Sequence, residues 1–173
     1  MLLLFASTFL GVFLAFLLGI WGQSAQRRHI DDLQRYETVQ SILGELWALQ
    51  TTLVVISSVP TDFPGTHIPV DITDNAVRSA ISSGRFALLA PSTQIAISFV
   101  YSKVRMVEKI MELLYLRPDL MLDRGKEERE AVGKLYDLSV ELLEPLIPVL
   151  IESLNKTPKP LSSTWDYMMA DLG

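Results

Sequence analysis

The chain contains no cysteine among its 173 residues. Without thiols it cannot build a disulfide framework, a thiolate metal site, a cysteine nucleophile or a lipid-modified cysteine. It has only two histidines, His29 and His67, and neither stands in a Glu-x-x-His or His-Glu-x-x-His sequence. Because helical proteins use those spacings to hold metal ions, we predict neither a metal site nor a cofactor.

Catalytic and phosphate-binding motifs are missing as well. The sequence has no G-x-x-x-x-G-K-[ST], G-x-G-x-x-G or G-x-S-x-G segment, which would cradle phosphates or expose a nucleophilic serine. Glu108 and Glu112 lie one helical turn apart beside basic residues, a pattern typical of a solvated face. Glu45 lies between Leu43 and Leu46, and we expect it to face solvent from the edge of an apolar stripe. No residue is assigned a catalytic role, and we expect a protein that is not an enzyme.

Basic residues are too few and too scattered for a nucleic-acid binder. The chain carries 15 lysines and arginines against 20 acidic residues, for a net charge of −5. No basic stripe is present to neutralise a phosphate backbone, so we exclude nucleic acid as a partner.

The first 26 residues lack charged side chains altogether, and the first charge belongs to Arg27. Residues 1–22 are apolar and span roughly 33 Å as a helix, enough for a hydrocarbon core of about 30 Å. Trp21 ends this run where an interfacial aromatic residue is expected. A cleaved signal peptide is the alternative, but it requires a basic segment before the apolar run and a small residue where Gln23 stands. We predict a retained transmembrane helix.

Positive charges flank this helix on one side only. Arg27, Arg28 and Arg35 follow it, whereas no lysine or arginine precedes it. The positive-inside rule therefore predicts a single-pass protein of the cell membrane with its N-terminus outside and its C-terminal domain in the cytosol. An exported domain on the opposite face is the alternative. Trp21, Arg27 and Arg28 are the predicted membrane-surface residues, since arginines attract anionic headgroups.

The rest of the sequence has helical periodicity. Apolar residues recur at steps of three and four over residues 29–57, over residues 91–116 and from Arg124 or Lys126 onward. Pro145 and Pro148 must bend or break the last of these helices, because proline removes a helical donor.

A proline-rich segment, residues 59–73, is expected to form a loop before a short helix over residues 74–83. Asp71 or Thr73 is placed to cap the start of that helix, and Gly84 to end it. We predict an all-α protein with a single N-terminal transmembrane helix followed by an antiparallel three- or four-helix bundle. The predicted domains are the transmembrane helix (1–22), the bundle (23–156) and a proline-containing linker with a C-terminal tail (157–173).

The C-terminal tail is the strongest candidate for a binding segment. Ser163 or Thr164 is placed to cap a short helix that presents large apolar residues on one side: Trp165, Met168 or Met169, and Leu172. Such spacing is typical of a peptide that inserts anchors into a partner's groove. The alternative is that the tail folds back on its own bundle, with Trp165 filling a gap.

Short segments of the chain resemble a loose class of prokaryotic single-pass membrane proteins that carry a small cytosolic helical domain. The resemblance rests on the ILGELW segment at 42–47, the AISSG segment at 80–84, Leu88-Leu89 and Tyr101. It covers about residues 1–115 and implies a similar membrane topology. It implies no activity.

These observations predict a non-enzymatic, membrane-anchored helical interaction module. Its expected partners are the lipid bilayer and a protein, either a second copy of this chain or another subunit of a membrane assembly. The alternative function is a membrane-tethered sensor that binds a ligand or lipid between the bundle helices, beneath the 59–73 segment.

Overall fold

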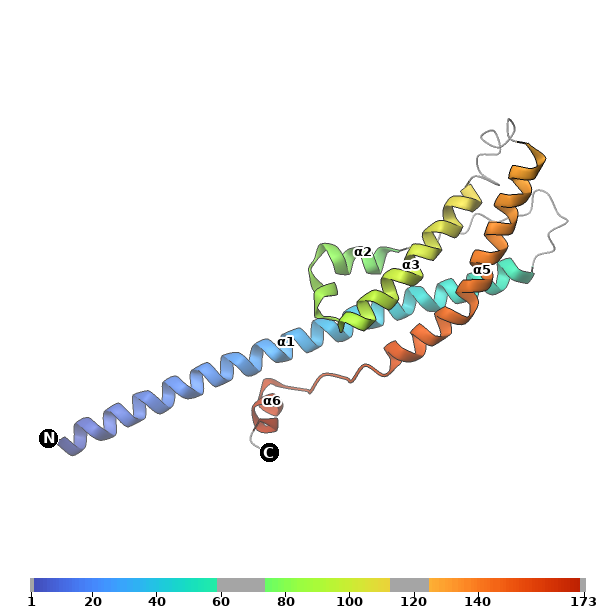
Figure 1. The fold of residues 1–173 in the computed structure, drawn as a ribbon. Coiled ribbons are helices and arrows are strands. Elements are labelled where there is room, and N and C mark those ends of the chain that lie inside the picture. Colours follow the sequence, from blue (N-terminus) through green and yellow to red (C-terminus); the bar gives the residue numbers. More distant parts are fainter. Residues whose placement is uncertain (1, 59–73, 113–124, 172–173) are drawn as a thin grey trace. The chain divides into compact units, whose positions relative to one another are not determined.

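The computed structural model describes residues 2–58, 74–112 and 125–171. Each element in these ranges is helical (Figure 1): α1 (Leu2–Ser58), α2 (Asn75–Ser82), the 3-10 helix η1 (Arg85–Leu88), α3 (Pro91–Met111), α5 (Lys126–Asn155) and α6 (Thr164–Ala170). The predicted all-α class is therefore confirmed for the described residues. The predicted loop at 59–73, with His67, and the tail residue Leu172 lie outside them.

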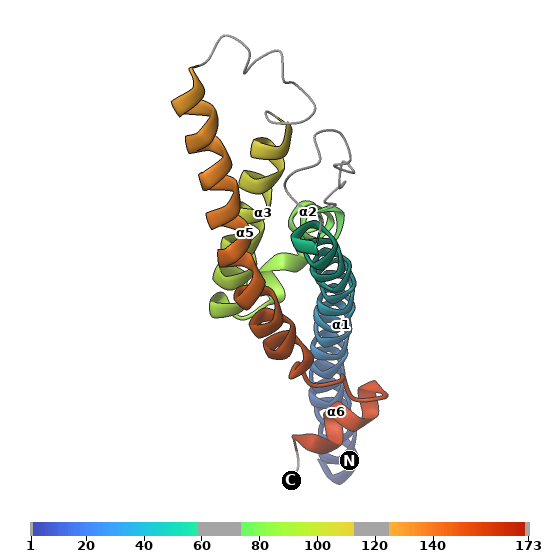
Figure 2. The same ribbon diagram turned by 90° about the vertical axis from the view of Figure 1, so that its right-hand side faces the viewer.

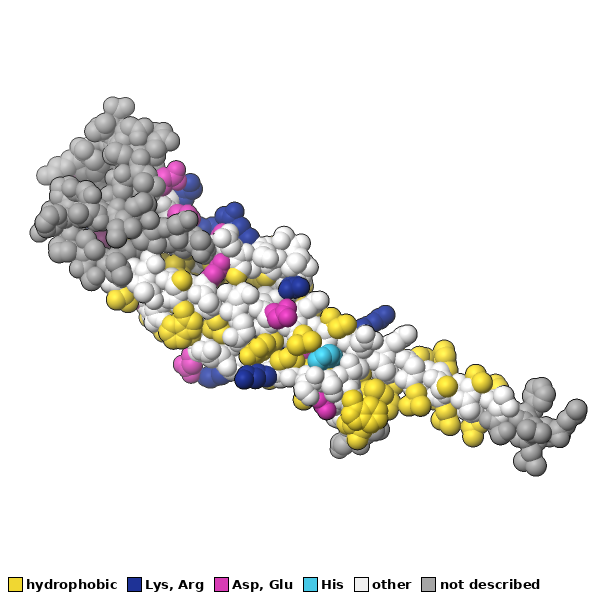
Figure 3. Space-filling model, turned by 180° about the vertical axis from the view of Figure 1, so that it is seen from behind, with side chains coloured by type: hydrophobic (Ala, Val, Ile, Leu, Met, Phe, Trp, Pro, Cys, Tyr) yellow, Lys and Arg dark blue, Asp and Glu magenta, His cyan; other side chains and the backbone are white. Residues whose placement is uncertain are grey.

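α1 joins two predicted helical segments into one. It continues through Gly22 and Arg27 as far as Ser58, which the absence of proline from this stretch allows. Large apolar side chains are exposed along its N-terminal part, at nearly every position from Phe9 to Ile20. Figure 3 shows them on both edges of this part of the helix. α1 is thus long and apolar enough to cross a membrane.

The chain forms two compact units that share α1. Unit 1 comprises Met1–Glu37 and Pro158–Gly173, and unit 2 comprises Thr38–Thr157. The first unit therefore groups the N-terminal part of α1 with the C-terminal tail, including α6.

Unit 2 has a core of aliphatic side chains drawn from α1, α2, α3 and α5. The largest fully buried members are Ile42, Leu46, Ile97, Leu143, Ile147 and Leu154. α3 and α5 lie side by side (Figure 2). The buried positions of α3 follow the predicted steps of three and four, because one face of each helix must be apolar to cover its neighbour.

The helix ends in unit 2 follow the sequence closely. α2 begins after Asp74, and Gly84 follows it with a left-handed φ of 75°, a conformation that glycine adopts without strain. α5 begins at Lys126 and continues through Pro145 and Pro148. Its axis turns between its two ends (Figure 1). The prolines therefore leave α5 a single bent helix, although each deprives a carbonyl four residues earlier of its donor.

Candidate functional site

In unit 1, the C-terminal tail with α6 lies against α1 from the end of the apolar run onward. We call this contact the tail junction and define it by Trp21, Arg28 and Asp32 of α1 and by Tyr167 and Asp171 of the tail. The three α1 residues are spaced by seven and four, so they share one face of the helix. Ala25 lies on the same face and is completely buried, so its short side chain suits the close approach of the tail.

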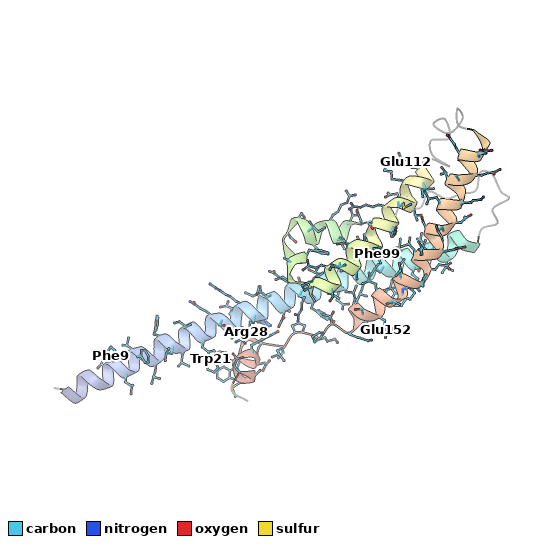
Figure 4. The ribbon with its side chains drawn as sticks, viewed as in Figure 1. Phe9, Trp21, Arg28, Phe99, Glu112 and Glu152 are labelled. Carbon is cyan, nitrogen blue, oxygen red and sulfur yellow. The ribbon has the colours of Figure 1, made fainter. Side chains whose placement is uncertain are left out.

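Asp171 binds two residues of α1 at once. Its carboxylate accepts a hydrogen bond from the Trp21 indole Nε1 at 3.2 Å and another from the Arg28 Nη1 at 2.8 Å, and the Arg28 Nη2 also donates to it. Figure 4 shows Trp21 and Arg28 beside α6. The hydrogen bond from Arg28, followed by that from Trp21, lowers the pKa of Asp171 to about 2. The Asp171 carboxylate is therefore charged near neutral pH.

Tyr167 makes the second polar connection of the tail junction. Its side chain is buried, and its hydroxyl donates to Asp32 Oδ2 at 2.9 Å while accepting from the backbone N–H of Leu161 at 3.3 Å. The Tyr167 ring also lies 5.3 Å from the ring of His29. Burial, followed by the hydrogen bond to Asp32, raises the pKa of Tyr167. The neutral tyrosine thus remains a donor at neutral pH.

The opposite face of α6 is apolar and uncovered. Trp165 is 64% exposed and Met169 is 48% exposed, while Met168 is half-buried. Helical spacing places these residues on one side, with Tyr167 on the other. As predicted, Ser163 caps the helix, its Oγ accepting from the Asp166 N–H at 3.3 Å. Of the predicted tail face, Trp165 and Met169 are thus exposed and Met168 is half-buried.

The predicted membrane-surface residues have different surroundings. Trp21 and Arg28 donate hydrogen bonds to Asp171, and both Arg27 and Arg28 are exposed. The hydrogen bond from Arg28 to Asp171 raises the pKa of Arg28. Of the two adjacent arginines, Arg28 is thus committed to the tail and Arg27 faces outward.

Unit 2 contains a polar cluster around Glu45, formed by Glu45, Asp74, Tyr101 and Arg105. Glu45 Oε1 accepts a hydrogen bond from the backbone N–H of Ala76 at 2.5 Å, and Oε2 accepts from the Tyr101 hydroxyl at 2.9 Å. The expectation that Glu45 faces solvent is therefore wrong. Its carboxylate takes the place of a local cap for α2, because a helix N-terminus offers free N–H donors and favours negative charge.

Asp74 lies beside this interaction and is buried. It accepts from Arg105 Nη2 at 2.6 Å and pairs with Arg78 Nε at 2.5 Å. Burial by itself raises the pKa of Asp74, but the hydrogen bonds from Arg78 and Arg105 outweigh it and hold the pKa below its usual value. Asp74 is also the N-cap residue of α2, in place of the predicted Asp71 or Thr73, although its side chain binds arginines rather than the helix N-terminus.

The chemistry of this cluster is that of a structural network. Both Glu45 oxygens accept hydrogen bonds from donors on other elements, and Asp74 is neutralised by two guanidinium groups. Burial, followed by the charge of Glu45, raises the pKa of Tyr101, so its hydroxyl keeps its proton. Within residues 2–58, 74–112 and 125–171, no three acidic or histidine side chains converge to hold a metal ion.

A second uncovered apolar face lies on α5 in unit 2. Its members are separated by three, four and seven residues, and each is at least 41% exposed: Leu135, Leu138, Leu142 and Val149. They lie on the side of α5 that faces away from its buried stripe, which includes Leu143 and Ile147. Regular spacing of this kind is typical of a helix surface that packs against another helix.

Sequence reasoning missed the polar partners in both units. Glu45 and Tyr101, two residues of the segments that carry the resemblance, bind each other across 56 positions of the chain. Tyr167 and Asp32 meet across 135 positions. The local signal for Tyr167 was its position on the face of α6 opposite Trp165, which marks it as the side that packs inward.

Comparisons with protein-family models, with curated proteins and with solved structures returned no match.

Proposed function

We propose that this protein is a non-enzymatic membrane-anchored module that holds a helical domain at the membrane surface for assembly with a protein partner. The observation that carries the proposal is the contrast along α1. Its N-terminal part exposes apolar side chains all round, and its C-terminal part supplies Ile42 and Leu46 to a packed core. One helix thus combines the composition of an anchor with that of a bundle helix.

The proposed topology is single-pass, with an antiparallel bundle following the membrane helix. Arg27 and Arg28 follow the apolar run and no basic residue precedes it, which favours a cytosolic location for the bundle and an external N-terminus. The exposed side chain of Arg27 supports a position among anionic headgroups.

The proposed protein partner contacts the uncovered face of α5. Leu135, Leu138, Leu142 and Val149 form a stripe with the spacing that two helices use to interdigitate. A second copy of the chain and a different subunit both fit this stripe, and both make the protein a scaffold. An accessory subunit of a membrane assembly is the role that fits the absence of catalytic motifs from the sequence.

Topology is the first test. A C-terminal tag should resist protease in intact spheroplasts and be cut in inverted vesicles, with the protein retained in carbonate-washed membranes at uncleaved mass. Cleavage of the tag in spheroplasts would overturn the cytosolic location. Loss of about 25 N-terminal residues, the size of a signal peptide, would overturn the anchor.

Partner contact is tested separately by crosslinking in cells. A photoreactive amino acid at Leu138 should give a discrete crosslinked band, whose mass distinguishes a homodimer from a different subunit. The matched control is the same amino acid at Glu141, an exposed polar position of α5, which should give none. Equal labelling from both positions, or none from Leu138, would contradict an interaction through this face.

A further inference from the structure

We propose that α6 is a second membrane contact, whose apolar face, the exposed Trp165 and Met169 with the half-buried Met168, inserts into the interfacial region of the bilayer beside α1. The inference rests on the proposed membrane anchoring. It differs from the expectation from the tail sequence, because lipid and not a groove of a protein partner contacts the apolar face of α6. It assigns a role to the tail junction, which holds α6 at the level where α1 leaves the membrane.

The position of the tail junction along α1 is the first argument. Trp21 closes the apolar run, and Asp171 binds its indole directly. Arg28 and Asp32, the other attachment points, lie about 10 and 16 Å further along the helix axis. The headgroup and interfacial layer on each side of a bilayer is several ångströms thick, so the Trp21 end of the junction lies within it when residues 2–20 occupy the hydrocarbon core.

The chemistry of the exposed face is the second argument. Trp165 and Met169 expose an indole and a thioether. Tyr167, which lies between them in the sequence, is buried on the other side of α6. Tryptophan is enriched at membrane–water interfaces because one end of its ring is apolar and the other carries a donor. An amphipathic helix in this position buries its apolar face about 5–10 Å below the headgroups.

The charges around α6 are the third argument. The Asp171–Arg28 pair neutralises two groups that would otherwise lie next to the apolar face. Arg27 of α1 and Lys159 of the tail are exposed in the same unit, where they suit anionic headgroups. The contact begins where the exposed apolar surface of α1 ends, since Ile20 is exposed and the next residue, Trp21, donates to Asp171.

The absence of cysteine makes the test direct. Single-cysteine variants of the full chain, Phe13→Cys, Met169→Cys and Lys156→Cys, are labelled with an environment-sensitive fluorophore and reconstituted into vesicles of phosphatidylcholine and phosphatidylglycerol. Lipids with brominated acyl chains then report contact with the bilayer, and iodide reports contact with water. Phe13 is the positive control for the proposed anchor, and Lys156, exposed in unit 2, is the negative control.

We expect labels at positions 13 and 169 to be quenched by brominated lipid and protected from iodide, and the label at 156 to behave in the opposite way. Quenching at 13 with iodide access at 169 would overturn the role of α6 while leaving the anchor intact. No lipid quenching at 13 would overturn the anchor itself. Protection of position 169 from both quenchers would mean that a protein covers α6 and would also overturn the proposal.

Matched tryptophan variants add a second readout. In the Met169→Cys background, Trp165→Ser should reduce lipid quenching and increase iodide access, because it removes the largest side chain of the inserted face. Trp47→Ser should change neither, since Trp47 is exposed to a similar extent but lies in unit 2. Equal effects of the two substitutions would contradict a specific insertion of α6.

Discussion

The two parts of α1 have apolar side chains in common and differ in what surrounds them. Between Phe9 and Ile20 these side chains point in all directions and stay exposed, whereas between Val39 and Leu53 most of them form one stripe that is buried in unit 2, and Trp47 lies outside that stripe. A protein core needs one apolar face per helix, but a hydrocarbon solvent accepts every face. The comparison teaches that the distribution of apolar residues around a helix, more than their number, indicates which solvent it is built for.

The largest expected effect comes from making the N-terminal part of α1 polar. The double substitution Leu14→Arg/Leu17→Arg places two charges near the centre of the apolar run, at about 2.5–3.5 kcal/mol each. The protein should then leave the membrane fraction after carbonate extraction. Ile81→Arg, at an exposed position of unit 2, is the control and should leave the distribution unchanged. Full membrane retention of the double variant would remove the distinction between the two parts of α1.

The next largest effect is a difference in stability between substitutions of a buried and an exposed leucine in α5. Leu143 is fully buried and its neighbour Leu142 is 45% exposed. Leu143→Ala should lower the free energy of unfolding by about 2–5 kcal/mol because it leaves a cavity in the core. Leu142→Ala should change it by less than about 0.5 kcal/mol, as at most surface positions. Urea denaturation of the full chain in detergent micelles measures both values, and similar losses would contradict the assigned core.

A smaller effect is expected in the polar cluster around Glu45. Glu45→Ala leaves the buried hydroxyl of Tyr101 without its acceptor and should lower the free energy of unfolding by about 1–3 kcal/mol. Tyr101→Phe in the same chain removes that orphan group, so the double variant should be more stable than the sum of the single losses predicts. Urea denaturation of the four proteins gives the coupling energy. A coupling of zero would show that the two residues do not stabilise each other.

The smallest effect is a pH dependence confined to unit 1. The pKa of Asp171 is lowered to about 2 and that of Tyr167 is raised. Because its pKa is lowered, Asp171 stabilises the contact between the tail and α1 above the ordinary carboxyl pKa of about 4. This stabilisation is lost as the pH falls toward 2. Because its pKa is raised, Tyr167 stabilises the same contact below the ordinary tyrosine pKa of about 10. This stabilisation is lost as the pH rises further.

Protection of the tail backbone from hydrogen exchange, corrected for intrinsic rates, should therefore stay constant between about pH 5 and pH 9 and fall outside that window. Asp171→Asn should reduce this protection at neutral pH and abolish its fall at acidic pH. The control Asp137→Asn, at an exposed position, should do neither. If protection of the Asp171→Asn variant still falls at acidic pH as in the unchanged chain, another group controls the contact between the tail and α1.

Much of the fold was predictable because helices have a local signature. The steps of three and four that predict α3 and α5, Ser163 as a cap and Gly84 as a stop all depend on residues within one or two turns of each other. The exposed face of α6 was predictable for the same reason. The molecule that contacts this face was not predictable, because periodicity shows that a face is apolar but not what binds it.

The order of the residues is enough to predict a helical chain, an N-terminal run that suits a membrane, and the apolar side of each helix. The packing of distant segments is what brings Glu45 to the start of α2 and to Tyr101. It also brings Tyr167 to Asp32, and Asp171 to Arg28 and Trp21. The physical reason is range. Helix formation depends on neighbours in the chain, whereas a hydrogen bond between side chains depends on where distant backbones meet, and single polar residues have no periodicity from which that meeting can be predicted.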